Sequence, residues 1–400
     1  MKKIILLLCC LLALAGCAGT QARVTLGVER LAEPQVRELL ADKRLGLFTN
    51  QSGVDGTLQA SVDLLRRQYD LRALFVPEHG LFGAVKAGDE FGSGVYDGLP
   101  VFSLYGDTRR PTREMLENID ALVVDIQDVG TRHYTYFSSL AYIMEECAKY
   151  DKEVIVLDRP NPLGGAVQGP VLKDEFATFI GLYALPLRHG LTIGEFARYI
   201  NVEEKIGCRL QVVPLKHYRR SMLWRDTGLP WVLTSPLIPT EETALLYCVT
   251  GVGGDTNLSV GVGTAQPFAV IGAPFADAQE VKRALDALQL PGVAFRAAAF
   301  TPRYGAYEGE LVQGVEIYLL DQRHANLPEL GYLLVQTFQR LYPGKVLFPE
   351  RGYGAPGYKA DIALGESSLR RSEDAEATFA RWREECAAFT QKAQPYLLYK

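Results

Sequence analysis

The sequence predicts an α/β protein built on an open, mostly parallel sheet, followed by a smaller α+β domain. Short apolar segments rich in β-branched residues alternate with helix-like segments through the first half of the chain, as strands and helices do in such sheets. Three prolines in the eleven residues 229–239 then mark a passage to a differently patterned, glycine-rich second half. We therefore expect one domain over residues 24–230 and a second over residues 231–400.

The N-terminal segment predicts export. Two lysines precede an unbroken apolar run, and small residues precede Cys17, which is typical of a bacterial lipoprotein signal whose cysteine is lipidated. The run is shorter than the roughly 20 residues that span a membrane. We expect removal of residues 1–16 and a lipidated linker over 17–23. An uncleaved anchor and an ordinary signal peptide are the alternatives.

This interpretation predicts a cell-envelope lipoprotein that faces the periplasm. Ala18 carries no evident retention signal for the inner membrane, so we expect anchoring in the outer membrane, through the lipid alone. Diffusible cytosolic cofactors such as ATP and NAD are not expected there, and we predict no cofactor. The substrate should be a component of the envelope.

Composition narrows the class of protein further. The chain is 48% hydrophobic and 22% charged, as ordinary globular proteins are. Its net charge of −5 argues against nucleic acid as a partner. Four cysteines follow Cys17 without CxxC spacing, so neither a zinc site nor a disulfide framework is indicated. These four cysteines could form one disulfide, or all four could be buried free thiols.

The predicted elements alternate in the first half and change pattern in the second. Four strands buried on both faces are expected at 45–49, 71–76, 121–126 and 153–157, with helices at 60–68 and 139–149. In the second half we expect helices at 277–288, 327–341 and 374–391, and strands at 293–300 and 313–320.

Polar residues follow each of the four strands. Ligands of open α/β sheets bind beyond the carboxyl ends of the strands, so these residues are candidate site residues. The first strand leads to Asn50 and the second to Glu78 and His79. The third ends at Asp125 and Asp128, and the fourth leads to Asp158, Arg159 and Asn161. One sheet edge is thus predicted to collect carboxylates, an imidazole and amides.

Glu78 is the candidate general acid. It lies between Pro77 and Gly80, just after a buried strand and near apolar side chains. Burial disfavours the charged form of a carboxyl group, and a protonated glutamic acid is what a leaving-group oxygen requires. The alternative is a glutamate that caps the start of a helix.

A second carboxylate would complete the equipment of a glycoside hydrolase, which usually places a pair around the scissile bond. Asp125 and Asp128 lie three residues apart at one strand end, so at most one should point where Glu78 points. That group would act as base, nucleophile or orienter, with His79 and Tyr134 positioning it. A metal held by His79, His133 and these aspartates is an alternative; we predict no metal.

Aromatic and cationic residues suit a sugar acid. Tyr134 and Tyr136 follow the aspartate pair and could lie against a sugar face, or could pack in the core. Arg132 and Arg159 at the same edge could bind an anionic substituent, since arginine geometry matches a carboxylate. Either arginine could instead pair with a nearby aspartate.

The glycine-rich stretch 251–264 does not indicate a nucleotide site. It has no Lys-Ser/Thr ending and no acidic residue placed after a βαβ unit, so it is neither a P-loop nor a dinucleotide fingerprint. The run at 257–261 lacks the first glycine of the G-x-S-x-G motif of serine hydrolases. A tight loop at the domain junction is the preferred interpretation.

Eight runs spread over nearly the whole chain resemble the NamZ family of exo-β-N-acetylmuramidases. They are TNQSG (49–53), PEHG (77–80), SLYG (103–106), DIQDVG (125–130), YTY (134–136), LDRPNPLGG (157–165), HGLTIGE (189–195) and YLLY (396–399). The resemblance implies a Rossmann-like domain joined to a smaller domain, with the active site in the cleft between them. It also implies release of N-acetylmuramic acid from the non-reducing ends of peptidoglycan fragments, with Glu78 catalytic and the lactyl carboxylate as the anion.

The second half departs from the pattern of this family. Gly254 and Asp255 stand where an E-G pair precedes Thr256 and Asn257, and Val262 stands where the family has arginine. Valine offers no hydrogen-bond donor, so Asn257 is the substrate-binding candidate that remains here. The alternative function is an envelope lipoprotein that binds muropeptides without cleaving them, and a third is a metal-assisted hydrolase.

Overall fold

The computed structural model describes residues 22–86, 88–89 and 92–400. The predicted signal and Cys17 lie outside these residues, as does most of the expected linker. Within the described ranges, no helix combines the length and the apolar character needed to cross a bilayer. We call residues 24–230 the first lobe and residues 231–400 the second lobe.

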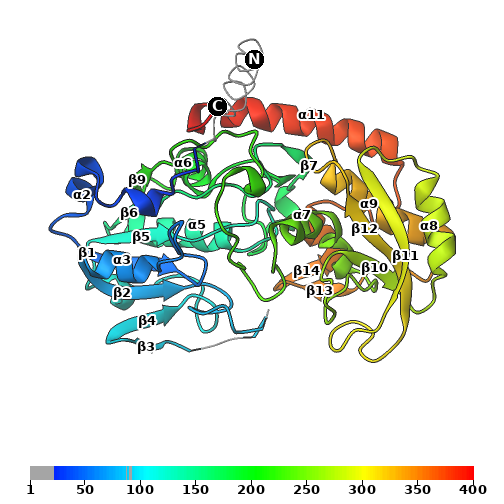
Figure 1. The fold of residues 1–400 in the computed structure, drawn as a ribbon, viewed down its shortest axis with the longest axis horizontal. Helices are drawn as coiled ribbons and strands as arrows, with labels where there is room; N and C mark the ends of the chain where they lie inside the picture. The colour runs from blue at the N-terminus through cyan, green and yellow to red at the C-terminus, as the bar shows by residue number, and fades with distance from the viewer. Residues whose placement is uncertain (1–21, 87, 90–91) are drawn as a thin grey trace, which may run out of the picture.

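The first lobe is organised around a seven-stranded sheet (Figure 1). Its order is β3-β4-β2-β1-β5-β6-β9, and every neighbouring pair is parallel except β3 with β4. All four predicted strands are present, which confirms the predicted fold class. The bounds are β1 (Arg44–Thr49), β2 (Asp70–Val76), β3 (Gly94–Tyr96), β4 (Leu99–Ser103), β5 (Ala121–Asp125), β6 (Glu153–Leu157) and β9 (Arg209–Val213).

Helices and a small ribbon surround this sheet. The central strands β1, β5 and β6 are almost entirely buried, because they are covered on both faces as in other parallel sheets. The remaining elements are η1 (Gly27–Arg30), α2 (Pro34–Leu40), α3 (Ser61–Arg66), α4 (Arg113–Leu116), α5 (Tyr136–Lys149), the antiparallel pair β7 (Gln168–Val171) and β8 (Pro186–Arg188), η2 (Asp174–Phe176), α6 (Ile193–Glu203) and η3 (Trp224–Asp226).

The order in which strands are added to the sheet changes direction at β1. Strand β2 lies on one side of β1 and β5 on the other, so the carboxyl ends of these strands form the crevice where such sheets bind ligands. Thr49 pairs in register with Asp125, and its Oγ1 donates to the Asp125 carbonyl at 2.8 Å. The residues that follow β2 therefore leave the sheet beside this crevice.

The second lobe is α+β, as predicted. Its three-stranded antiparallel sheet has the order β10-β12-β11, and α8 contacts β11, β12 and α9. The bounds are α7 (Glu241–Thr250), η4 (Val252–Asp255), β10 (Val270–Ala273), α8 (Ala278–Asp286), β11 (Val293–Phe300), β12 (Val312–Leu319), α9 (Leu327–Leu341), β13 (Glu350–Gly352), β14 (Ala355–Tyr358) and α10 (Lys359–Leu364).

The C-terminal helix α11 (Ala375–Ala393) runs along both lobes (Figure 1). It packs on β7, and the residues after it, including η5 (Gln394–Tyr396), return to the first lobe. There the Tyr399 hydroxyl donates to Asp158 Oδ2 at 2.5 Å. The last residues of the chain thus pack with the first lobe, although the sequence pattern groups them with the second.

A continuous apolar core joins the two lobes, with side chains from β5, α5, α7 and α9 in one cluster. All four cysteines after the signal, Cys147, Cys208, Cys248 and Cys386, are buried and free. Of the two alternatives open from the sequence, the structure therefore contains the buried thiols. Burial also raises the pKa of the Cys248 thiol to about 11, so this group behaves as a small apolar side chain.

Candidate active site

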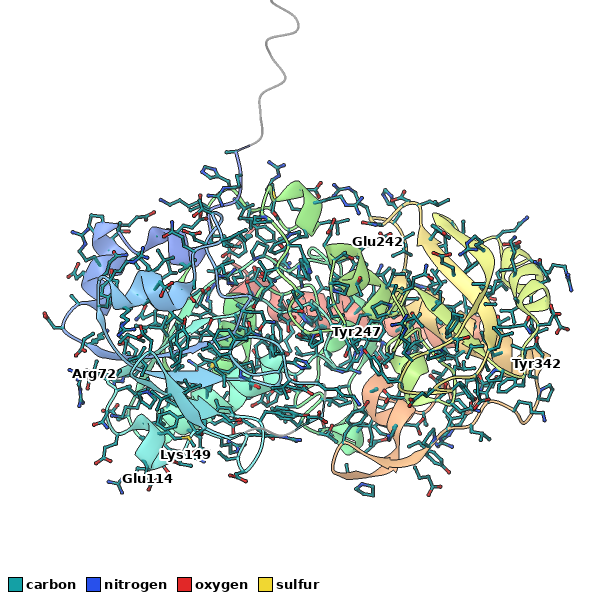
Figure 2. The ribbon with its side chains drawn as sticks, turned by 60° about the horizontal axis from the view of Figure 1, so that its bottom comes forward. Arg72, Glu114, Lys149, Glu242, Tyr247 and Tyr342 are labelled. Carbon is teal, nitrogen blue, oxygen red and sulfur yellow. The ribbon has the colours of Figure 1, made fainter. Side chains whose placement is uncertain are left out.

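A cavity of about 360 Å³ opens between the lobes. Tyr247, on α7, lies in the middle of the molecule between the two lobes (Figure 2). Both lobes contribute to the cavity wall, which is mostly aromatic and apolar. The lining residues are Glu78, His79, Gly88, Tyr105, Arg109, His133, Tyr134, Thr135, Phe179, Ile180, Ser235, Leu237, Ile238, Tyr247, Phe268 and Tyr353.

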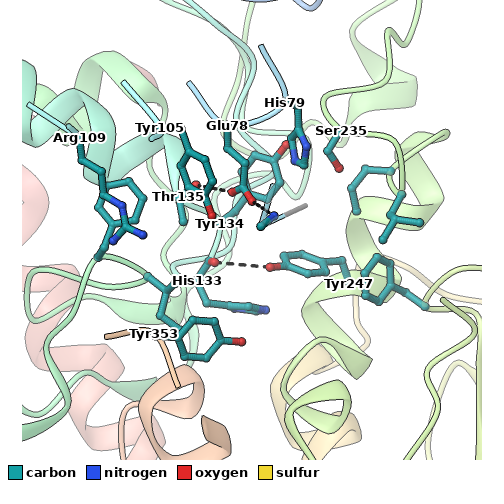
Figure 3. Close-up of a pocket in the computed structure, with 16 residues that line it drawn as sticks. Glu78, His79, Tyr105, Arg109, His133, Tyr134, Thr135, Ser235, Tyr247 and Tyr353 are labelled. Carbon is teal, nitrogen blue, oxygen red and sulfur yellow. Dashed lines mark hydrogen bonds between the residues drawn. The ribbon is translucent and has the colours of Figure 1, made fainter. Parts of the chain in front are cut away.

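Glu78 presents its carboxyl group to this cavity (Figure 3). It follows the last residue of β2 by two positions and is half-buried. The backbone N–H of Gly88 donates to Oε1 at 2.8 Å, and the Thr135 hydroxyl donates to Oε2 at 3.4 Å. These two hydrogen bonds come from different segments, so they fix the direction in which the carboxyl group points.

A strained turn follows Glu78. His79 is buried and has a φ of 74°, and Gly80 has a φ of 72°. A left-handed backbone at a histidine is uncommon and is maintained by its surroundings. His79 Nδ1 lies 2.8 Å from the Val85 carbonyl, and a carbonyl only accepts, so Nδ1 carries the proton. In the neutral ring Nε2 is then the acceptor.

Two residues that line the cavity have buried polar atoms without protein partners. Among the described residues, both ring nitrogens of His133 and the hydroxyl of Tyr134 have no hydrogen-bond partner. Burial lowers the pKa of His133 to about 3, with Arg132 adding to this effect, so the ring is neutral. It stacks on Tyr247, with centroids 4.5 Å apart. Buried polar groups normally have partners, so these atoms are exceptions in the wall of the cavity.

The second lobe contributes a tyrosine coupled to a carboxyl group. Tyr353 lines the cavity with a φ of 58°, and its hydroxyl donates to Asp255 Oδ1. Burial raises the pKa of Asp255 to about 7, although the Tyr353 hydroxyl acts in the opposite direction. Asp255 thus orients a side chain that lines the cavity.

Arg109 enters the cavity from the first lobe (Figure 3). Its guanidinium carbon lies 4.2 Å from the ring centroid of Phe179 and 5.4 Å from that of Tyr105. Within the described part of the chain it has no hydrogen bond or ion pair, and no other lysine or arginine lines the cavity. Its donors are therefore available to a ligand.

Comparison with known proteins places this architecture in a family. Residues 45–242 match the family model described as exo-beta-N-acetylmuramidase NamZ, N-terminal, and residues 245–399 match the corresponding C-terminal model. The chain belongs to the NamZ family. It is 46% identical, over 82% of its length and 81% of the relative's, to the peptidoglycan beta-N-acetylmuramidase NamZ of Bacillus subtilis strain 168.

Two crystal structures of DUF1343 family proteins from Bacteroides fragilis NCTC 9343 share the fold of this NamZ chain. One has a TM-score of 0.84 and 38% identity, and covers 94% of this chain and 99% of its own. The other has a TM-score of 0.76 and 28% identity, with coverage of 95% and 99%. The two-lobed arrangement is therefore common to these proteins.

The aspartates expected to partner Glu78 lie outside the lining of the NamZ cavity. Both carboxylate oxygens of Asp125 accept from Arg159, at 2.7 and 2.9 Å, in a fully buried pair. Asp128 Oδ2 accepts from the backbone N–H of Gly130 at 2.6 Å, while its Oδ1 is buried without a partner. Among the described lining residues, Glu78 alone carries a carboxyl group.

The two arginines expected to bind an anion are bound within the protein instead. Arg159 pairs with Asp125 and also donates to the Val54 carbonyl at 2.6 Å. Arg132 is 2% exposed. Its guanidinium donates to four backbone carbonyls, those of Pro170, Leu185, Ala363 and Leu364. Neither guanidinium reaches the cavity, because each already holds neighbouring segments together.

Of the remaining residues predicted to bind substrate, one lines the cavity and the others are bound within the protein. Tyr134 lines the cavity, whereas Tyr136 lies behind it, with its hydroxyl between Asn50 Nδ2 and the Thr234 carbonyl, each at 2.7 Å. Asn161 and Asn257 bind backbone groups through both their oxygen and nitrogen atoms. Asp158 is buried beneath α6, where Thr192, Gly194, Arg159 and Tyr399 donate to it.

The candidate metal ligands do not form one donor set. Within the described ranges, no group of three or more His, Cys, Asp or Glu side chains is arranged to hold a metal ion. Asp125 is already paired with Arg159. The histidine that the structure places next to Asp128 is His189, whose Nε2 lies 3.8 Å from Oδ2, whereas His79 and His133 line the cavity.

Most of the residues that line the cavity were not among the candidates from the sequence. Arg109 and Phe179 come from loops without strand signals, and Tyr247 and Tyr353 come from the second lobe. Tyr105 and Thr135 lay in runs that resemble the NamZ family, although neither was a candidate site residue. The available signal for Asp255 was its place as the single acidic residue of the glycine-rich stretch 251–264.

Proposed function

We propose that this protein is an exo-acting glycoside hydrolase that releases β-linked N-acetylmuramic acid from the non-reducing ends of peptidoglycan fragments. The NamZ relative from Bacillus subtilis is a peptidoglycan beta-N-acetylmuramidase. The observation that carries the proposal for this chain is Glu78, whose carboxyl group is fixed at the wall of the interlobe cavity. The cavity volume of about 360 Å³ falls within the range of small-molecule sites.

Glu78 acts as the general acid in this proposal. Its proton passes to the glycosidic oxygen while the bond from that oxygen to C1 of the sugar breaks. Water supplies the hydroxyl group that C1 gains, and the remaining proton of that water returns the Glu78 carboxyl group to its acid form. Gly88 N–H and the Thr135 hydroxyl hold the carboxyl group, so it need not reorganise during the transfer. The rings of Tyr105, Tyr134 and Tyr247 offer surfaces for the sugar.

Replacement of Glu78 tests the assignment. With the full chain purified in detergent, Glu78→Gln should reduce hydrolysis of a chromogenic β-N-acetylmuramide by about 10²–10⁴-fold, while binding persists. Glu242→Gln, on the exposed side of α7, is the matched control and should retain activity. Equal activity in both variants would contradict the role of Glu78. Binding without hydrolysis by the unaltered protein would favour a muropeptide-binding lipoprotein.

We further propose that the protein is an outer-membrane lipoprotein facing the periplasm, attached through Cys17. The support is the basic, apolar and small-residue pattern of residues 1–17. Labelled palmitate should be incorporated into the full chain and recovered in the outer-membrane fraction. Cys17→Ser should abolish the labelling, and persistent labelling in that variant would refute the proposal.

A further inference from the structure

Arg109 combines contacts with two aromatic rings with a lack of hydrogen-bond and ion-pair partners in the described part of the chain. Its guanidinium lies against the rings of Phe179 and Tyr105, which attract a cation without using its N–H donors. Neighbouring Arg110, by contrast, donates to Glu145 and Glu146, at 2.6 and 3.0 Å. Arg109 is exposed and packs against two rings, which leaves its N–H groups available to a ligand.

The ligand class follows from this geometry. A planar guanidinium with free N–H groups binds a carboxylate through two parallel hydrogen bonds. Muramic acid differs from glucosamine by a lactyl ether on O3, and that ether carries a carboxylate. We propose that Arg109 is the specificity residue that binds the free lactyl carboxylate of the sugar; this inference rests on the proposed muramidase function.

Other cations are not placed to do this. Arg132 and Arg159 are bound inside the protein, and His133 is neutral because burial lowers its pKa to about 3. Lys86 lies 5.7 Å from the ring centroid of Tyr304, outside the cavity lining. Val262 offers no donor.

The position of Arg109 also suits a substituent beside the scissile bond. In Figure 3 the ring of Tyr105 lies between Arg109 and Glu78. A sugar resting on this ring could direct its glycosidic oxygen towards Glu78 and its lactyl group towards Arg109. Arg109 would then bind and orient the substrate, without taking part in bond breaking.

A double substitution cycle, on protein and on substrate, tests the contact. The full chain and Arg109→Gln are each assayed on a chromogenic β-N-acetylmuramide and on its lactyl carboxamide. Either change alone should reduce kcat/KM by about ten- to hundredfold, as expected for a hydrogen bond to a charged group. Both changes together should cause little further loss, because they remove the same contact. Most of the effect should appear in KM.

Controls separate this contact from general damage. Arg110→Gln removes the adjacent arginine, which lies outside the cavity lining, and should leave the preference for the carboxylate unchanged. Arg109→Lys should recover part of the preference, because a charge returns without the planar fork. If the double change reduced kcat/KM by the product of the two single reductions, the proposal would be overturned, even if the unaltered chain were fully active.

Calorimetry keeps the two proposals distinguishable. If the unaltered chain hydrolyses neither substrate, the proposed function fails, and binding of free N-acetylmuramic acid still tests Arg109. That binding should weaken about ten- to hundredfold in Arg109→Gln, while binding of the carboxamide should not change. Equal binding of the two sugars by the unaltered chain would refute the role of Arg109.

Discussion

His133 shows how a single buried residue links the cavity to stability. Burial lowers its pKa from 6.5 to about 3, so between these values the unfolded chain binds a proton that the folded protein rejects. Stability therefore falls as the pH decreases through this range. At pH 5 the loss attributable to His133 is about 2 kcal/mol relative to pH 7.5.

Replacing His133 by phenylalanine should remove this dependence while keeping a ring against Tyr247. Urea unfolding at pH 7.5 and pH 5 should show a smaller decrease in the free energy of unfolding for His133→Phe than for the unaltered protein. His217→Asn is the control, because His217 is exposed and asparagine tolerates its left-handed φ of 64°. If His133→Phe and the unaltered protein lose equal stability, the ring is protonated in the folded state without penalty.

Part of the site could be predicted from the residue types that follow the strands, because polar side chains at the carboxyl ends of parallel strands commonly bind ligands. Glu78, His79 and Tyr134 line the cavity and were candidates from their positions after strands. Arg132 and Arg159 were candidates on the same basis, yet their partners lie up to 232 residues away in sequence. No local pattern distinguishes an arginine that is bound internally from one that is free, so Arg109 could be recognised only in the folded molecule.

The central strands of the first lobe were predictable because their residues are uniformly buried and apolar, whereas the short buried strand β10 was missed. Strands β1, β5 and β6 have nearly continuous apolar sequences and agree with the predicted ranges to within a residue or two. Edge strands β3 and β9 are partly exposed and lack such runs, so they were missed. Helix α6 was missed as well, although Thr192 and Glu195 form the capping box that marks a helix start.

Thr192, at the start of α6, caps the helix and also bonds to a buried carboxyl group. The Thr192 hydroxyl accepts from the Glu195 N–H and donates to buried Asp158 at 2.8 Å. Thr192→Ala should therefore cost about 2–3 kcal/mol of stability, combining a lost cap with a lost buried hydrogen bond. Thr240→Ala, at the exposed cap of α7, should cost about 1 kcal/mol. Equal losses in urea unfolding would show that the contact with Asp158 adds nothing.

At the scale of the whole molecule, the cavity depends on how the lobes are held together. Glu78 and Arg109 come from the first lobe, and Tyr247 and Tyr353 from the second. Sequence analysis predicted two domains but not the ties between them. These ties include α11, which packs on β7, and Arg132, whose partners lie on β7, before β8 and on α10.

Arg132→Met tests whether the hydrogen bonds of Arg132 to both lobes position the residues that line the cavity. Four buried carbonyls lose their donor, so the free energy of unfolding should decrease by about 3–5 kcal/mol, and kcat/KM should fall even where the protein is fully folded. Arg188→Met is the matched control. Arg188 is equally buried but donates only to Gln168 and Leu163 within the first lobe, so stability should decrease while kcat/KM of the folded protein persists. Because the two variants remove the same buried charge, unchanged kcat/KM in Arg132→Met would mean that the shared apolar core positions the lobes without it.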